Sequence, residues 1–290
     1  MKTPIQLCIC AAAALLLSVS TSPAPTLNVT SFGALDRNAN LVANGSFELG
    51  HPPGAGYIWV SGSTLGPFAP IPSWTSAGGI NAYGVWGDSA ALEGSAPLPH
   101  GTNGLYFGNA FVSAISASPS SYSAGGVYTF ASPPTITPQD ATYSPAVNLR
   151  QTVSLNIGTL YRLSFWTSGE NAAAGGYPSD GLFEVNVSGY DRLFLGTPSA
   201  GVNSVLGSQK LYDIEFTALS ASTTLSFINY GHFVREDPQT PPTAGWTFAP
   251  GTTTELVLDD VILNAVPEPG TLALAALAGA MLLWRRKRNA

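Results

Sequence analysis

The chain has 290 residues, of which 45% are hydrophobic and only 10% are charged, so that uncharged polar residues must cover most of its surface. This length fits one large domain with short terminal segments. Five of the 11 basic residues and one of the 17 acidic residues lie near the two ends, which leaves 6 basic against 16 acidic residues, a net charge of −10, in the body; such a surface repels phosphate backbones and argues against nucleic acid as a partner.

A secretory signal peptide is predicted over residues 1–22. Lys2 supplies a positive n-region, residues 9–17 form an apolar stretch, and small residues suited to cleavage follow. Both cysteines, Cys8 and Cys10, fall inside this segment, and neither follows the small residues that a lipoprotein signal needs. The mature chain is therefore expected to be exported and to contain neither disulfides nor cysteine-bound metal.

Short runs of alternating apolar and polar residues recur through residues 38–265, after a segment at 23–37 that is interpreted as a loose leader or linker. Clusters of Gly, Pro, Asn and Ser separate the runs, and helix signals are nearly absent. The run from Leu160 to Trp166 shows the alternation of a strand with one buried face. The pattern predicts an all-β fold, an antiparallel β-sandwich with two sheets over one core. Further runs lie at 105–107, 153–155, 182–187, 212–216, 225–227 and 255–263, and Pro-rich stretches at 119–145 and 237–250 are expected to be long loops.

Two motifs bracket this body: NLVANGSFE at 40–48 and LDDVIL at 258–263. Their order resembles that of the galactose-binding-like jelly rolls, a fold that includes many carbohydrate-binding modules. The intervening motifs are similar to those of the cell-wall-associated subfamily of that fold. The resemblance covers about 40–264 and implies a jelly-roll domain that binds carbohydrate. The intervening motifs are IPSW at 71–74, PHGTNGLYFG at 99–108, QTV at 151–153 and YRLSF at 161–165.

The bracketing motifs carry carboxylates that the resemblance brings together, because the first and last strands of such sandwiches pair side by side. Glu48 is expected to end the first strand, and Asp259 and Asp260 lie in the last. Carboxylates gathered at a strand edge either bind a hard cation or repel each other, so one structural calcium ion (Ca2+), as in related modules, is one interpretation. In the alternative, Asn44 and Gly45 form a turn, and Asp259 or Asp260 caps loops through backbone hydrogen bonds.

Aromatic and planar polar side chains are the candidates for sugar binding, because sugars present flat C–H faces to rings and hydroxyls to fixed polar partners. Four candidates lie in Gly/Pro-rich segments, where a jelly roll places its ligand loops: Trp59, Trp74, Tyr83 and Trp86. Four more project from strand faces opposite the core residues and would line a concave sheet: Arg162, Trp166, Glu184 and Asn186. The alternative is structural: Trp74 would plug the core beneath a loop, and a long connection would cover Trp166.

Catalytic motifs of the common hydrolase and phosphate-binding types are missing from the sequence, and its three histidines are isolated. Acid pairs such as Asp180 with Glu184, or Glu236 with Asp237, would suit a glycosidase. A body with 16 acidic residues forms such pairs by chance, however. The chain is therefore predicted not to be an enzyme, and a glycan-active hydrolase is the less favoured alternative.

The tail at 266–290 combines a Pro-Glu-Pro motif, an apolar stretch from Leu272 to Trp284 and a basic cluster at 285–288. As a helix, the stretch from the motif to Trp284 would be roughly 27 Å long, close to the ~30 Å hydrocarbon core of a bilayer. The basic cluster behind it suits the cytoplasmic side. This tail resembles the PEP-CTERM sorting signals of Gram-negative bacteria, which implies recognition by an exosortase, a membrane protease. The motif residues are Val266, Pro267, Glu268 and Pro269.

These features together predict an exported, non-catalytic surface or extracellular-matrix protein. Its jelly roll is expected to bind polysaccharide, either an exopolysaccharide or a cell-wall glycan. The tail would anchor the precursor in the inner membrane as a transmembrane helix until exosortase, a transient partner, processes it. The protein would then reach the cell surface or the matrix. The alternative is a purely structural matrix protein in which the sandwich is a stable spacer without a glycan ligand.

Overall fold

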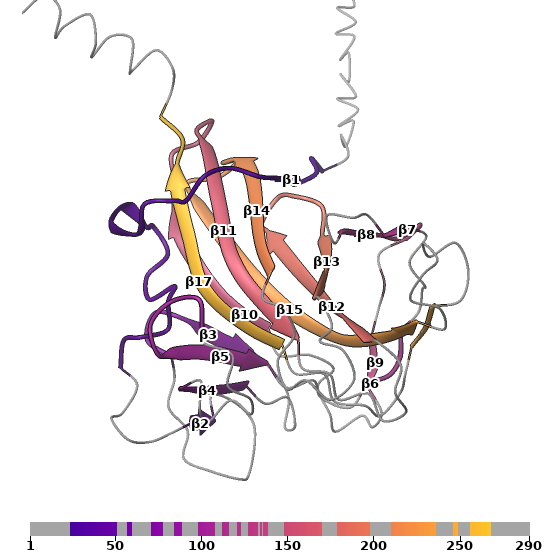
Figure 1. Cartoon of the computed structure of the whole chain (residues 1–290). Coiled ribbons are helices and arrows are strands. Elements are labelled where there is room, and N and C mark those ends of the chain that lie inside the picture. The colour runs from indigo at the N-terminus through magenta and orange to yellow at the C-terminus, as the bar shows by residue number, and fades with distance from the viewer. Residues whose placement is uncertain are drawn as a thin grey trace, which may run out of the picture.

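The computed structural model describes residues 24–50, 57–59, 71–77, 84–88, 98–107, 112–115, 121–122, 127–132, 134, 136–138, 148–169, 179–197, 210–235, 246–248 and 256–267. They form two large antiparallel sheets, a separate two-stranded sheet and one short 3-10 helix, η1 (Arg37–Ala39), which confirms the predicted all-β antiparallel sandwich (Figure 1). The first sheet runs in the order β1 (Asn28–Thr30), β14 (Lys210–Thr217), β11 (Leu160–Gly169), β17 (Leu256–Ala265), β5 (Asn103–Phe107), β4 (Gly84–Asp88), β2 (Tyr57–Trp59).

The second sheet faces the first across the core. Its order is β3 (Thr75–Ala77), β10 (Asn148–Ser154), β15 (Ser222–Arg235), β12 (Ser179–Val187), β13 (Leu193–Thr197), β8 (Val127–Thr129), β7 (Ser121–Tyr122), with β16 (Trp246–Phe248) paired to β15. A separate pair consists of β6 (Val112–Ile115) and β9 (Ile136–Pro138).

Aromatic rings from both sheets meet in the core. Phe165 of β11 contacts Phe227 of β15 edge-on at 5.3 Å between ring centroids, and Phe183 of β12 stacks on Phe227 at 5.8 Å. The alternation in β11 explains this arrangement, because Leu163 and Phe165 are fully buried while Arg162 and Trp166 on the opposite face are half-buried. Burial of such rings supplies much of the stability of a sandwich core.

Residues 23–37 were expected to be a loose leader, and the structure corrects this expectation. β1 adds an edge strand to the first sheet by pairing with β14, with Val29 opposite Ile214. Leu27 is buried in the core, and the side chain of Asp36 accepts a hydrogen bond from the amide of Asn38 to cap η1. The strand β1 spans only three residues, which is too short for a recognisable pattern, and its pairing with the edge strand β14 sets its geometry.

The two Pro-rich stretches expected to be long loops contain short strands. β7, β8 and β9 fall within 119–145, and β16 falls within 237–250. β8 extends the second sheet by pairing with β13, where Tyr128 lies opposite Phe194. Two- and three-residue strands carry too little alternation to be recognised by pattern, because their strand geometry is set by the longer neighbour that they pair with.

The motif at 40–48 lies along β17, as the resemblance implied, but as a series of turns rather than as a strand. The amide of Leu41 donates to the carbonyl of Leu263, and the amide of Val261 donates to the carbonyl of Gly45 at 2.8 Å. Asn44 and Phe47 have φ values of 52° and 58°, which a strand does not accommodate. The motif therefore covers β17, which pairs with β11 on one side and with β5 on the other.

Among the residues described, no helix is long and apolar enough to cross a membrane. The predicted signal peptide, the stretch from Leu272 to Trp284, and the motif residues Glu268 and Pro269 lie outside the described residues.

We predict that Gly45→Ala lowers the free energy of unfolding by about 1–3 kcal/mol, because overpacking at this site has no flexible side chain to displace. A Cβ atom on Gly45 would lie 2.0 Å from the carbonyl oxygen of Val261. Urea denaturation measures the effect. Gly33→Ala is the matched control, since nothing lies within 4 Å of a Cβ there, and it should change stability by less than about 1 kcal/mol. Equal effects of the two substitutions would contradict the proposed close contact.

Candidate functional site

A groove of about 620 Å³ lies where the N-terminal segment meets the edge of the second sheet. Three stretches of chain line it: Thr26 and Leu27 before β1, residues 127–130 in and after β8, and residues 190–194 at the start of β13. This volume is within the range of small-molecule and cofactor sites. The groove thus depends on the pairing of β8 with β13 and on the ordered segment before β1.

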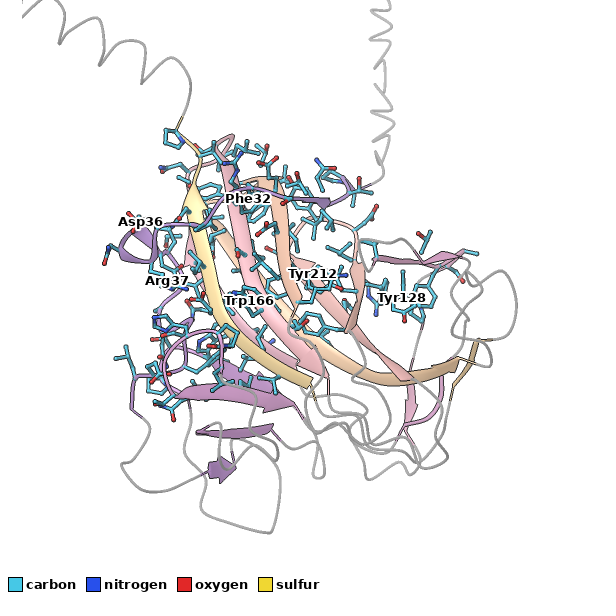
Figure 2. The ribbon with its side chains drawn as sticks, viewed as in Figure 1. Phe32, Asp36, Arg37, Tyr128, Trp166 and Tyr212 are labelled. Atoms are coloured by element: carbon cyan, nitrogen blue, oxygen red, sulfur yellow. The ribbon has the colours of Figure 1, made fainter. Side chains whose placement is uncertain are left out.

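Aromatic rings form one wall of the groove. Phe130 packs edge-on against Phe194 with 4.9 Å between ring centroids, and Tyr128 lies 6.5 Å from Phe130. Phe194 is 5% exposed, whereas Phe130 is half-buried and presents part of its ring to the surface. Figure 2 shows Tyr128 beside β8, on the opposite side of the molecule from Arg37. The wall therefore offers one accessible ring on a fixed aromatic base.

A buried ion pair fixes the polar side of the groove. Arg192 donates from Nε to Oε1 of Glu184 at 2.9 Å and from Nη2 to Oε2 at 2.6 Å. The side chain of Glu184 is 2% exposed, and that of Arg192 is 29% exposed. Arg192 also lies over the ring of Phe194 at 5.0 Å and donates to the carbonyl of Pro134. The guanidinium is thus held rigidly beside the aromatic wall by charge-assisted hydrogen bonds.

Two further contacts close the end of the groove. The hydroxyl of Tyr190 donates to the carbonyl of Thr217 at 2.6 Å and accepts from its amide at 2.9 Å. The amide of Asp191 donates to the carbonyl of Pro25 at 2.9 Å, which secures the N-terminal segment. An accessible ring beside fixed polar groups is the combination that suits a ligand with both flat apolar faces and hydroxyls.

Trp74 was predicted to lie in a ligand loop, with a core position as the alternative. The structure places it in the core. It is 6% exposed and contacts Phe47 and Phe227 at 5.6 and 6.1 Å between ring centroids. Its indole N–H donates to the carbonyl of Asn44 at 3.0 Å. The ring therefore closes the core beneath the turn at 40–48 and is not available to a ligand.

Trp59 and Trp86 were also expected in loops, but they lie on paired strands. Trp59 ends β2 opposite Val85, and Trp86 is in the middle of β4 opposite Leu105. The Gly and Pro residues around them hid these strands from a reading of the sequence. Tyr83 lies outside the described residues, so its predicted role in ligand binding stays a prediction.

The four residues expected to line one concave sheet do not lie together. Arg162 and Trp166 are on the outer face of the first sheet, whereas Glu184 and Asn186 are on the outer face of the second. Arg162 forms an ion pair with Glu215 at 2.6 Å and lies 4.8 Å from the centroid of the ring of Phe32, which is labelled in Figure 2. Of the four, only Glu184 takes part in the groove, as the buried partner of Arg192.

Apart from Glu184, the residues that build the groove were not among those predicted from the sequence. Tyr128 and Phe130 alternate with Val127 and Thr129, but the surrounding prolines suggested a loop. Arg192 was a second possible indication of the groove, because the body has only 6 basic residues and the buried Glu184 needs one of them as its partner. The pairing of Glu184 with Arg192 followed from strand register, which one sequence does not reveal.

The side chain of Glu48 holds the loop at 101–103. Its Oε1 accepts the backbone amides of Thr102 and Asn103, both at 2.7 Å, and its Oε2 accepts from the side chains of the same residues at 3.2 and 3.1 Å. Gly101 is favoured here because its φ of 70° is a backbone conformation that other residues rarely adopt, and a Cβ atom would also crowd Oε1 of Glu48. Four donors use the four acceptor positions of the carboxylate.

Asp259 and Asp260 are likewise engaged within the protein. Asp259 accepts the amides of His100 at 3.0 Å and of Asp260 at 2.6 Å. Asp260 receives two hydrogen bonds from Arg37, at 2.9 and 2.6 Å. Within the described residues, no three His, Cys, Asp or Glu side chains form a set that could hold a metal ion. These contacts favour the alternative in which the carboxylates cap loops, and a calcium ion shared by Glu48, Asp259 and Asp260 stays a prediction.

The solved structures that match this chain do so at low sequence identity and with low TM-scores. TmCBM61, solved in complex with β-1,4-galactotriose, is 14% identical with a TM-score of 0.39, over 78% of this chain and 99% of that one. The K1 cleaved adhesin domain of Lys-gingipain from Porphyromonas gingivalis is 13% identical with a TM-score of 0.37, over 73% and 99%. The CBM22-1 xylan-binding domain from Paenibacillus barcinonensis Xyn10C is 11% identical with a TM-score of 0.29, over 68% and 87%. No curated protein matches the chain.

The tail has a direct match. Residues 265–288 match the PEP-CTERM protein-sorting motif. This confirms the prediction that was made from the Pro-Glu-Pro motif, the apolar stretch and the basic cluster. The match begins at Ala265, the last residue of β17, so the sorting signal follows the sandwich without a linker.

We predict that Asp259→Asn stabilises the protein increasingly as the pH rises. Burial raises the pKa of Asp259 from its usual 3.8 to about 8, although the amides of His100 and Asp260 oppose the rise. The folded state therefore favours the protonated carboxyl. The contribution of Asp259 to the free energy of unfolding is fully present below about pH 4 and is lost as the pH rises to about 8. The asparagine variant lacks this loss. The difference in free energy of unfolding should grow with pH by at most about 1.4 kcal/mol per unit.

Urea denaturation of both proteins at several pH values between 4 and 8 measures this difference, and other titrating groups cancel in it. Asparagine accepts one hydrogen bond fewer, which adds an offset that does not vary with pH. A difference that stays constant or shrinks would show that Asp259 is ionised in the folded state. Thermal melts of the unaltered protein, with EDTA and with added calcium, separate the calcium-site interpretation of Asp259 from the loop-capping one. Loop capping predicts equal melting temperatures, and a rise with calcium would restore the cation site.

Proposed function

We propose that this chain is an exported, non-catalytic protein of the cell surface or extracellular matrix whose sandwich binds carbohydrate in the groove beside β8 and β13. The export and sorting part is supported by the PEP-CTERM match over residues 265–288. The carbohydrate part is carried by one observation, the half-buried ring of Phe130 next to the fixed guanidinium of Arg192. The sandwich supplies a rigid support for both groups.

The chemistry of the groove fits a neutral or weakly charged polysaccharide. The ring of Phe130 offers a flat apolar surface for sugar C–H groups, and the partly exposed guanidinium of Arg192 places a fixed positive charge in the same groove. The body has a net charge of −10, which disfavours strongly anionic glycans. A single ring gives weak binding, so many copies on one polymer would supply avidity.

A hydrolytic role has little support in the groove. A glycosidase needs one carboxyl group free to donate a proton and a second carboxylate placed across the bond. Both oxygens of Glu184 are hydrogen-bonded to Arg192, and the side chain is 2% exposed. Asp191 is exposed at the rim, where its amide secures the N-terminal segment. We therefore propose binding without cleavage.

Phe130→Ala should weaken binding to the polysaccharide that the protein selects on a glycan array by roughly threefold to tenfold, the loss of one ring contact. Isothermal titration measures the affinity. Phe32→Ala is the matched control, because Phe32 is also half-buried but lies on the outer face of the first sheet, against Arg162. It should leave the affinity unchanged.

Melting temperatures of both variants separate a lost contact from a lost fold. Loss of affinity in Phe130→Ala at an unchanged melting temperature supports the groove. Equal affinities of Phe130→Ala, Phe32→Ala and the unaltered protein would contradict the placement of the site. If no glycan on a broad array binds, the structural interpretation, a sandwich that acts as a spacer, replaces the binding one.

We further propose that the tail is cut near Pro267–Pro269 by an exosortase after residues 272–284 have inserted into the membrane. Intact-mass analysis of the protein isolated from its own cells should show a species that lacks the basic cluster at 285–288. Deletion of that cluster should keep the chain in the uncut form, because the cluster fixes the orientation of the span. A mature species that retains residues 285–288 would contradict the proposal.

A further inference from the structure

Both ends of the described chain leave the sandwich at the same end, which is uppermost in Figure 1. Four segments form this end, namely residues 155–160, 188–192, 218–221 and 264–267, and we call them together the terminal face. The amide of Val266 donates to the carbonyl of Leu160 at 2.8 Å, which places the exit of the chain beside the start of β11. The amide of Asp191 bonds to Pro25, which places the N-terminal segment at the same end.

The turns of the terminal face are bonded to each other and form one surface. The amide of Gly158 donates to the carbonyl of Ala218 at 2.9 Å, and the amide of Leu155 donates to the carbonyl of Ala221 at 3.0 Å. Leu219 lies directly over Gly189, where an added Cβ would come within 3.1 Å of its side chain. The position of each turn relative to the exit of the chain is therefore fixed.

Three large apolar side chains on this face are open to solvent. Ile157 is 67% exposed, Leu219 is 49% exposed and Leu160 is 37% exposed. Each sits in or next to a turn, where polar residues are the usual choice. Contiguous apolar side chains on a surface mark a contact with another protein or with a membrane.

Charged residues are scarce here. Of the four segments, only 188–192 contains any, namely Asp191 and Arg192, and Arg192 is paired with Glu184. A polybasic attraction to anionic lipid headgroups is therefore not available to this face. Contact with a partner would rest on the apolar side chains and would be nearly independent of salt.

The length of chain beyond the sandwich limits where this face can be. The predicted membrane span begins at Leu272, five residues after Pro267, the last residue described. Five residues reach at most about 18 Å even when fully extended. If the span is inserted, Pro267 must lie within that distance of the hydrocarbon core. The headgroup region takes up roughly 5–8 Å of it, so the terminal face is held at or close to the membrane surface.

We propose that, in the precursor that still carries its tail, the terminal face rests on the bilayer surface with Ile157, Leu160 and Leu219 in contact with lipid. This rests on the proposed function, in which residues 272–284 span the membrane. The bilayer is the favoured occupant because the short connection brings it there and the face is apolar and nearly uncharged. Cutting the tail would remove the connection that holds the face at the membrane, and the body would be released.

The test uses the full chain with Cys8→Ser and Cys10→Ser, reconstituted in vesicles of phosphatidylethanolamine and phosphatidylglycerol. Single cysteines are introduced by Ile157→Cys or Leu219→Cys and labelled with a polarity-sensitive fluorophore. Leu49→Cys is the matched control, since Leu49 is 63% exposed but lies beside Asn44, away from the terminal face. Ala280→Cys reports separately on insertion of the tail. A quencher attached to lipid acyl chains reads out contact with the bilayer.

Labels at 157 and 219 are expected to lose fluorescence to the lipid quencher, at low and at high salt, while the label at 49 does not. Labels at 157 and 219 that stay unquenched overturn the proposal, and quenching at 280 in the same samples would show that the anchor itself stands. Quenching at 157 and 219 without quenching at 280 would support the contact and overturn the anchor. A signal that depends on protein concentration and ignores the quencher would assign this face to a second copy and overturn the proposal.

Discussion

The close approach of Gly45 to the last strand is the constraint on which the rest of the structure depends. The carbonyl of Gly45 accepts the amide of Val261, and no side chain fits between the two backbones. The turn that contains Gly45 also places Asn44 over the indole of Trp74 and Glu48 over the loop at 101–103. One turn near the start of the body therefore fixes the last strand, the core beneath it and the neighbouring loop.

The position of β17 explains why this turn matters. β17 pairs with β11 and β5 and so joins the larger half of the first sheet to the strands β5, β4 and β2. It also leads directly into the sorting signal. The turn at 40–48 and β17 lie more than 200 residues apart in sequence, and they must meet before β17 is fully held in place. Such long-range pairing is slow to form, and export of the chain before folding is compatible with it.

The groove borders the terminal face, where the chain leaves the sandwich toward the sorting signal. The turn at 188–192 borders the groove through Tyr190 and Arg192, and it also belongs to the terminal face. The segment before β1 lines the groove with Thr26 and Leu27 and enters the sandwich at that same end. The groove is thus built from parts whose positions depend on both ends of the body, although the residues that would contact a ligand come from its middle.

The sequence predicted the fold class because the long strands carry their own signal. In β11, β12 and β14, alternate residues are apolar, and the structure buries those residues. The meeting of residues 40–48 with 258–263 was also predicted, since the resemblance that these motifs carry implied it. The turn geometry was not, because positive φ values at Asn44 and Phe47 arise from the packing of the turn on β17.

The candidate site was the least predictable part. Alternation showed that Arg162 and Glu184 face away from the core, but it does not tell which sheet a strand joins, and these two residues lie on opposite sheets. β8 has three residues, and only its pairing with β13 brings Tyr128 and Phe130 to Phe194 and Arg192. The core role of Trp74 likewise depends on contacts with residues far away in sequence.

Native-state hydrogen exchange tests most directly whether the turn at 40–48 locks the last strand up to the start of the sorting signal. The amides of Val261 and Leu263 donate to Gly45 and to the side chain of Asn40, whereas the amide of Val266 donates to Leu160 at the end of the sheet. The amides of Val261 and Leu263 are expected to exchange only through global unfolding, and that of Val266 through a much smaller local opening. Exchange of Val261 and Leu263 as fast as that of Val266 would contradict this expectation.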